Sequence, residues 1–219
     1  VYQLQESLSW LNMRAIEEAY NDMAKDAGYD KNANQARLAE LKLLTGKGFS
    51  GIYKNEASAL EAASKALQLK RDILLANTAL DMDKIIVGRY KIGTSARQVN
   101  PRALGTQNNN WSNQTSASRG GFNAEIAELS NLRGDVKTRT IFKPTNGSSV
   151  PDLKLHWDAD RLMFSMVDTD RRWQVFEVKL DGTGLKKLIE TPEKDLEFFD
   201  ATYLPSGKLI AVSNIGYNG

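Results

Sequence analysis

An internal repeat constrains the fold of this chain more than any other feature. Residues 155–165 return as residues 202–212 at an offset of 47, with Asp158 over Pro205. A period of roughly 40–50 residues is typical of one four-stranded blade of a β-propeller. The second copy reaches only about its second strand. Because a blade cannot bury both faces alone, we expect the remaining blades to come from the rest of a larger protein or from a partner protein.

An earlier segment, residues 84–129, contains strand patterns in the same order as the repeat. Ile126-Ala127-Glu128-Leu129 aligns with Val175-Phe176-Glu177-Val178 at an offset of 49, and residues 84–87 align with 161–164 at an offset of 77. A polar insertion at 94–121 accounts for the difference between these offsets. Short β-type runs separated by Asp- and Gly-containing turns predict meanders, with strands near 84–90, 125–129, 136–142, 161–167, 173–178 and 185–189. The sequence predicts one blade near 80–143, a second near 151–190 and the start of a third from about 197.

Helical periodicity characterises the residues before the repeat. Apolar residues at helical spacing predict helices near 3–27, 34–44 and 56–76. Gly28 is expected to stop the first helix, and Asn55 is expected to cap the third. Trp10, near the start of the chain, is expected to lie in a core or an interface. The predicted class is therefore mixed, with an α-helical N-terminal segment at 1–78 and an incomplete antiparallel all-β propeller at 79–219. The β part comprises about two and a half blades.

Charge and composition exclude several function classes. The net charge of +2 comes from 29 basic and 27 acidic residues in mixed order, so nothing indicates a nucleic-acid partner. No run of 18 apolar residues predicts a transmembrane segment. The chain has no cysteine and one histidine, which excludes disulfides, thiolate metal sites and multi-histidine metal sites within it. We expect no catalytic constellation, no metal site and no cofactor in this chain.

Five stretches carry a resemblance to a known family, at residues 75–87, 110–111, 121–126, 152–166 and 199–208. They resemble hydrazine synthase alpha-subunit-like proteins, which are large exported bacterial proteins with propeller blades of the TolB/PD40 type. The resemblance implies a propeller fold and an exported location, in the periplasm or at the cell surface, as for a lipoprotein or outer-membrane component. True hydrazine synthase subunits carry c-type haems bound through Cys-x-x-Cys-His, a motif that this sequence lacks.

Two groups of residues are candidates for ligand binding. His156 lies close in sequence to Asp158 and Asp160; it is either an axial ligand or general base, or a structural histidine at a blade corner. The insertion combines amides with one Trp, an inventory suited to glycan binding but also to an ordinary long loop. Its candidate residues are Arg97, Asn108, Asn110 and Trp111.

Two functions from different classes follow. The first is a non-enzymatic exported bacterial β-propeller module for binding or scaffolding, which binds a protein or a glycan through its loop faces. The alternative is a subunit of a haem- or metal-dependent redox enzyme of the hydrazine synthase type. A propeller hydrolase ranks last, because the sequence contains no recognisable nucleophile constellation.

Overall fold

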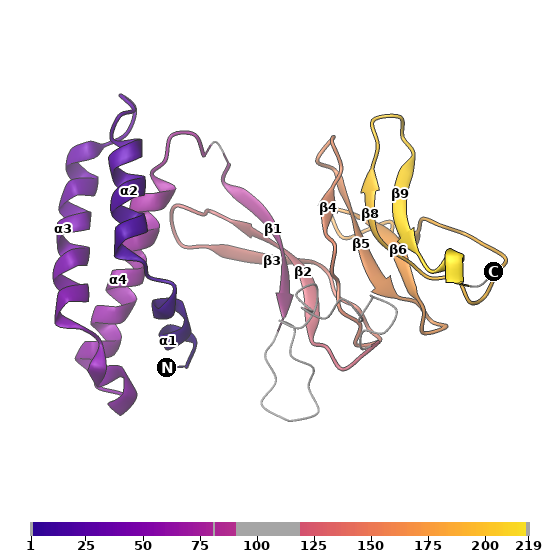
Figure 1. Ribbon diagram of the computed structural model, residues 1–219, viewed down its shortest axis with the longest axis horizontal. Helices are drawn as coiled ribbons and strands as arrows, with labels where there is room; N and C mark the ends of the chain where they lie inside the picture. The colour runs from indigo at the N-terminus through magenta and orange to yellow at the C-terminus, as the bar shows by residue number, and fades with distance from the viewer. Residues whose placement is uncertain (1, 81, 91–118, 218–219) are drawn as a thin grey trace. The chain divides into compact units, whose positions relative to one another are not determined.

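The computed structural model describes residues 2–80, 82–90 and 119–217 (Figure 1). The chain divides into two compact units, one formed by residues 1–83 with 131–136 and the other by 84–130 with 137–219. Most of the predicted insertion, including its four candidate residues, lies outside the described residues; these are Arg97, Asn108, Asn110 and Trp111.

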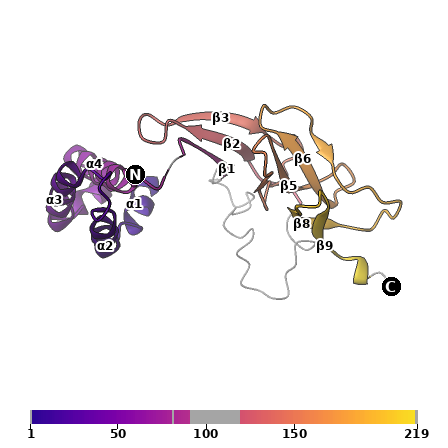
Figure 2. The same ribbon diagram turned by 90° about the horizontal axis from the view of Figure 1, so that it is seen from above.

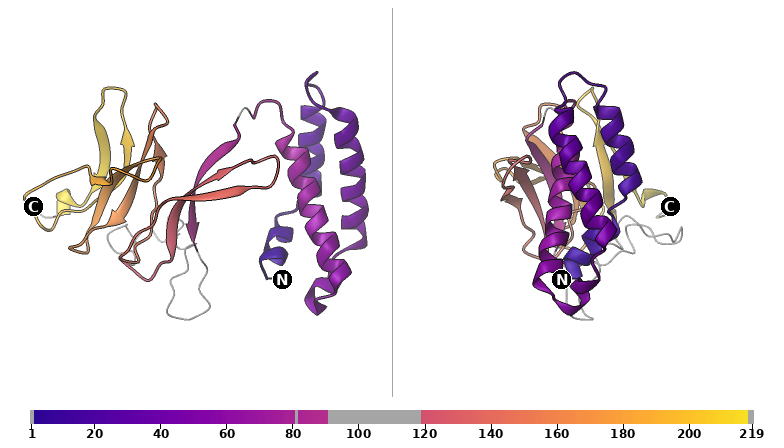
Figure 3. Two further views of the ribbon diagram at one scale, coloured as in Figure 1. Left: turned by 180° about the vertical axis from the view of Figure 1, so that it is seen from behind. Right: turned by 90° about the vertical axis from the view of Figure 1, so that its left-hand side faces the viewer.

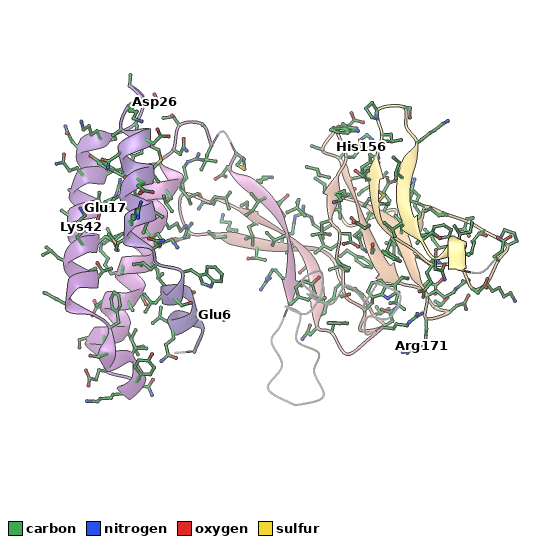
Figure 4. The ribbon with its side chains drawn as sticks, viewed as in Figure 1. Glu6, Glu17, Asp26, Lys42, His156 and Arg171 are labelled. Atoms are coloured by element: carbon green, nitrogen blue, oxygen red, sulfur yellow. The ribbon has the colours of Figure 1, made fainter. Side chains whose placement is uncertain are left out.

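The first unit is helical. Its elements are α1 (Tyr2–Ser9), α2 (Met13–Met23), α3 (Lys31–Lys47), the 3-10 helix η1 (Ser50–Lys54) and α4 (Ala57–Leu75). Helices α2, α3 and α4 run side by side (Figure 3). Their shared core consists of Ile16, Tyr20, Tyr29, Leu38, Leu41, Ala66, Leu69 and Ile73. An ion pair of 3.2 Å between Lys42 and Glu17 links α3 to α2 at the surface (Figure 4).

The helix boundaries differ from those predicted, and the second helix, predicted at 34–44, spans Lys31–Lys47. The first predicted helix is two helices, because the Asn12 side chain accepts a hydrogen bond from the Ala15 amide and starts α2 anew. Helix α2 ends at Met23 rather than at Gly28. Asn55 has a left-handed φ of 56° and ends η1, so the residue that precedes α4 is Glu56. Trp10 is 73% exposed.

The turn at 131–136 belongs to the helical unit. Arg71 of α4 donates hydrogen bonds to the carbonyls of Leu132 and Gly134, at 2.5 and 2.8 Å. Arg133 reaches in the opposite direction and donates to the carbonyls of Leu75 and Met82. The turn is therefore held to the helices by charge-assisted hydrogen bonds to backbone oxygens.

The described residues of the second unit form three antiparallel sheets, each built from strands in sequence order. Sheet 1 comprises β1 (Lys84–Tyr90), β2 (Ala124–Ser130) and β3 (Lys137–Phe142). Sheet 2 comprises β4 (Lys154–Leu155), β5 (Arg161–Val167), β6 (Trp173–Lys179) and β7 (Lys186–Lys187). Sheet 3 comprises β8 (Phe198–Tyr203) and β9 (Leu209–Ser213), and the 3-10 helix η4 (Ile215–Tyr217) follows it. The mixed class of helices followed by antiparallel sheets is confirmed.

Strand registers agree with the offsets in the sequence. Ile86 of β1 lies opposite Glu128 of β2, and Met163 of β5 lies opposite Glu177 of β6. The shifts from 86 to 163 and from 128 to 177 equal the sequence offsets of 77 and 49. Thus β1 and β2 are the structural counterparts of β5 and β6.

The hairpins β4–β5 and β8–β9 correspond less simply than the ungapped repeat predicts. Leu155 pairs with Leu162, and Tyr203 pairs with Leu209. The structural offset is therefore 48 before the turn and 47 after it, because the second turn is one residue shorter. The alignment of Asp158 with Pro205 is therefore wrong by one residue. The equivalent hydrogen bonds from the Ala159 amide to the His156 carbonyl and from the Gly207 amide to the Leu204 carbonyl place Asp158 over Ser206.

Consecutive sheets pack face to face (Figure 2). Phe164 and Phe176 of sheet 2 share a core with Ile126 and Ile141 of sheet 1. On the opposite face of sheet 2, Met163 and Val175 share a core with Ala201 of β8. Sheet 2 is thus buried on both faces, as its almost uninterrupted burial along β5 and β6 shows. Its two faces position the polar groups described next.

Candidate functional site

The turn between β4 and β5 brings His156, Asp158 and Asp160 together. One ligand-type atom from each of these side chains lies within 4.8 Å of the others. The His156 ring is largely buried, whereas the two aspartate side chains are 70% and 57% exposed. The three candidate residues that the sequence grouped here therefore do form one cluster.

Arg161 occupies the centre of this cluster. Its guanidinium lies 2.6 Å from His156 Nε2 and 2.7 Å from Asp160 Oδ1. Arginine only donates, so Nε2 is the acceptor in this contact, and the Asp158 amide lies 3.2 Å from Nδ1. Nδ1 is 3.3 Å from Asp158 Oδ2. Both ring nitrogens thus have partners.

A second carboxylate extends the network into the sheet. Glu177 of β6, with a side chain only 9% exposed, receives Arg161 Nε at 3.4 Å and Lys186 Nζ at 2.9 Å. The Tyr203 hydroxyl of β8 donates to the same carboxylate at 2.9 Å. Burial, followed by this bond to Glu177, raises the pKa of Tyr203 well above its ordinary range. The His156 ring packs edge-on against Tyr203, with centroids 4.7 Å apart.

Sheet 1 contains the same arrangement. Glu128 of β2 lies 3.8 Å from Lys84 Nζ and 3.1 Å from Arg139 Nη2. We call this arrangement the charge triad: a cation on the first residue of one strand, a glutamate on the next strand and a cation on the strand after that. In sheet 2 the triad comprises Arg161, Glu177 and Lys186. Sequence reasoning missed both triads, although the aligned glutamates signalled them.

This geometry favours a structural role for His156. A metal ion at the cluster would need the Asp160 carboxylate and His156 Nε2 as ligands, and the positively charged Arg161 already binds both. General-base catalysis through Nε2 would require Arg161 to leave. Among the described residues, no serine or threonine hydroxyl is hydrogen-bonded to His156. The network locks the β4–β5 turn to β6 and β8.

The same turn presents an apolar surface to solvent. Trp157 is 70% exposed, and Leu155 is 50% exposed. A large exposed aromatic ring beside carboxylates is suited to stacking against a sugar or packing against a protein partner. Trp157 was not singled out from the sequence; its place between His156 and Asp158 was the available signal.

A polar cluster around the buried Ser165 joins sheets 2 and 3. The Ser165 hydroxyl donates to Asp152 Oδ2 at 2.6 Å and accepts from the Asp200 amide at 3.0 Å. Burial raises the pKa of Asp152, and the nearby Asp200 charge raises it further, against the lowering effect of the Ser165 bond. Both aspartates have a left-handed φ, 61° and 46°, and lie at equivalent positions before β4 and within β8.

A pocket of about 760 Å³ lies at the other end of sheet 2, where the β5–β6 turn meets residues 142–146. His156 and Arg171 mark these opposite ends (Figure 4). Phe142, Met166 and Phe176 contribute apolar surface to the pocket, and Lys143 and Arg171 contribute charge. Arg172 is already paired with Asp168 and Asp170.

Comparisons of the chain with family models, curated proteins and solved structures find no match. No helix in the described ranges is long and apolar enough to cross a membrane. The sites must therefore be interpreted from their geometry.

Proposed function

We propose that this chain forms part of a non-enzymatic exported bacterial β-propeller that serves as a binding or scaffold module. The observation that carries the proposal is the repetition of register and of face-to-face packing in successive sheets. A propeller is built from four-stranded antiparallel meanders that pack in this way. Sheet 2 supplies one complete meander of four strands.

Equivalent side chains support the continuation of this packing. Ile86 of sheet 1 packs into the core shared with sheet 2, and its counterpart Met163 packs against sheet 3. The next counterpart, at the offset of 47, is Ile210 of β9, which is 58% exposed. Val212, on the same face of β9, is 48% exposed. A further sheet packed on this face would bury both side chains.

The turns at the ends of the sheets provide binding surfaces. Trp157 offers a stacking platform beside two exposed carboxylates at one end, and the pocket beside Lys143 and Arg171 offers cations at the other. Both surfaces support binding of a protein or a glycan through the loop faces. The charge network around His156 holds the Trp157 turn in place.

The test uses cysteine accessibility, because the chain has no cysteine of its own. Ile210→Cys and Tyr53→Cys are introduced separately into the gene, and the protein is labelled in its native assembly with a membrane-impermeant maleimide. Tyr53 is 81% exposed and serves as the control. We expect labelling of Tyr53→Cys on intact or osmotically shocked cells, with much slower labelling of Ile210→Cys. Equal rates at the two positions would contradict a covered β9 face, and labelling only after cell lysis would contradict export.

A further inference from the structure

The outer edge of β9 is the open end of the repeated arrangement. Within the described ranges, β9 pairs only with β8. Its counterparts β1 and β5 each pair with a following strand, β2 and β6 respectively. An unpaired strand edge exposes backbone donors and acceptors that another strand can complete.

A lysine at this edge lacks the glutamate partner that its counterparts in sheets 1 and 2 have among the described residues. Lys208 directly precedes β9 and is the counterpart of Arg161 at the offset of 47. Lys84 holds the same position in sheet 1. In those two sheets the cation pairs with Glu128 or Glu177. Within the described part of the chain, Lys208 is exposed and forms no ion pair.

We propose that the β9 edge binds an antiparallel strand that carries a glutamate opposite Ile210, and that this glutamate pairs with Lys208. The register is taken from the two complete cases, in which the glutamate lies opposite Ile86 and Met163. The strands that follow read Ile126-Ala127-Glu128-Leu129 and Val175-Phe176-Glu177-Val178. The occupant is therefore a strand with the pattern apolar, apolar, Glu, apolar. This inference rests on the proposed function, because it assumes that sheet 3 is extended.

A second copy of the chain does not satisfy this requirement. The β9 sequence, Leu209-Ile210-Ala211-Val212-Ser213, contains no carboxylate. The two glutamate-bearing strands of another copy, β2 and β6, are already paired on both edges. Charge complementarity thus points to a strand that lies outside the described residues.

The test captures a strand at the edge through a disulfide. The 219-residue chain is prepared by itself with Val212→Cys, because its described residues leave the β9 edge unpaired. The probe is a synthetic peptide of the β6 sequence 173–179 with its Val175 replaced by cysteine. That peptide position lies opposite Val212 in the proposed register, because Ser165 lies opposite Val175 in sheet 2. Mixed disulfide is measured at equilibrium in a glutathione buffer. The control protein carries Ser64→Cys on the exposed surface of α4.

Exchange of the charges on the two partners then tests whether the glutamate of the added strand pairs with Lys208. The protein is prepared with Lys208 or with Lys208→Glu, and the peptide is prepared with glutamate or lysine at its Glu177 position. We expect capture above the control, with the two opposite-charge pairs favoured over the like-charge pairs by about fivefold, the size of an exposed ion pair.

The outcomes separate the two proposals. Capture above the control without charge dependence would overturn the glutamate inference and leave strand addition intact. Capture no greater than at Ser64→Cys would overturn both the glutamate inference and the extension of sheet 3.

Discussion

Glu128 and Glu177 occupy equivalent positions in successive sheets, each between a cation on the preceding strand and a cation on the following strand. The distances from Glu128 to Arg139 and from Glu177 to Lys186 are 3.1 and 2.9 Å. Their alignment in the sequence therefore reflects a repeated electrostatic contact as well as a repeated strand.

Removal of the Glu177 charge is expected to destabilise the β unit. Glu177→Gln leaves Arg161 and Lys186 without their nearly buried carboxylate, at a cost of about 3 kcal/mol in the free energy of unfolding. Glu128→Gln, at a more exposed triad, is expected to cost about 1 kcal/mol. Urea denaturation of both variants measures the difference. An equal loss at the two positions would contradict the role assigned to burial.

Arg161 is expected to keep metal ions out of the His156 cluster. Addition of Zn²⁺ or Ca²⁺ should leave the Tm of the unmodified chain unchanged, because the arginine holds Asp160 and His156. Arg161→Ala frees these atoms, and its Tm, though lower at the outset, should rise on addition of metal. Differential scanning fluorimetry provides the readout. A metal-induced increase in the Tm of the unmodified chain would show that the cluster is a metal site.

Asp152 is expected to make the stability of the β unit depend on pH. Because its folded pKa is raised, the folded state binds more protons than the unfolded state between the ordinary value of 3.8 and the raised value. Stability contributed by this group is therefore lost as the pH rises through that window. Asp152→Asn should remove the dependence and keep an acceptor for Ser165, so its stability relative to the unmodified chain should be greater at pH 7 than at pH 4.

The matched control for this experiment is Asp181→Asn. The carboxyl of Asp181 has its pKa lowered by hydrogen bonds from Thr183, so its contribution should have the opposite sign. If the stability of the two variants changed with pH in the same way, the opposite pKa shifts assigned to Asp152 and Asp181 would be contradicted.

Gly182 and Gly46 should respond oppositely to alanine. Gly182 has a φ of 89°, and a Cβ there would lie 2.7 Å from the Ile141 carbonyl oxygen. Gly182→Ala should therefore cost about 1–2 kcal/mol or more in the free energy of unfolding. Gly46 lies within α3 with open space around the Cβ position, so Gly46→Ala should add up to about 1 kcal/mol. Chemical denaturation, followed separately in the helical and β units, checks both.

The strands were predictable because their sequences both alternate between apolar and polar residues and recur in the internal repeat. Residues 84–90 and 161–167 were placed at the bounds that β1 and β5 have. The helix ends were less predictable, since Asn12 restarts a helix within a continuous apolar stripe and Asn55 ends a 3-10 helix. A bond from the Ala15 amide to the Asn12 side chain decided the first of these ends, and the left-handed backbone of Asn55 decided the second.

The site was predictable only where its residues are close in sequence. His156, Asp158 and Asp160 come from one turn, so their spacing sufficed. Glu177 and Tyr203 join them from β6 and β8, through strand pairing and sheet packing that the local pattern does not encode.

The strand extension of sheet 3 holds only if the outer edge of β9 is paired when the protein is in its working assembly. Amide hydrogen exchange of 209–213, measured by mass spectrometry on protein isolated from its native source, tests this claim most directly. We expect the β9 amides to be protected to the same degree as those of β6, which is paired on both edges. Exchange of 209–213 as fast as in the exposed turn at 204–208 would contradict it.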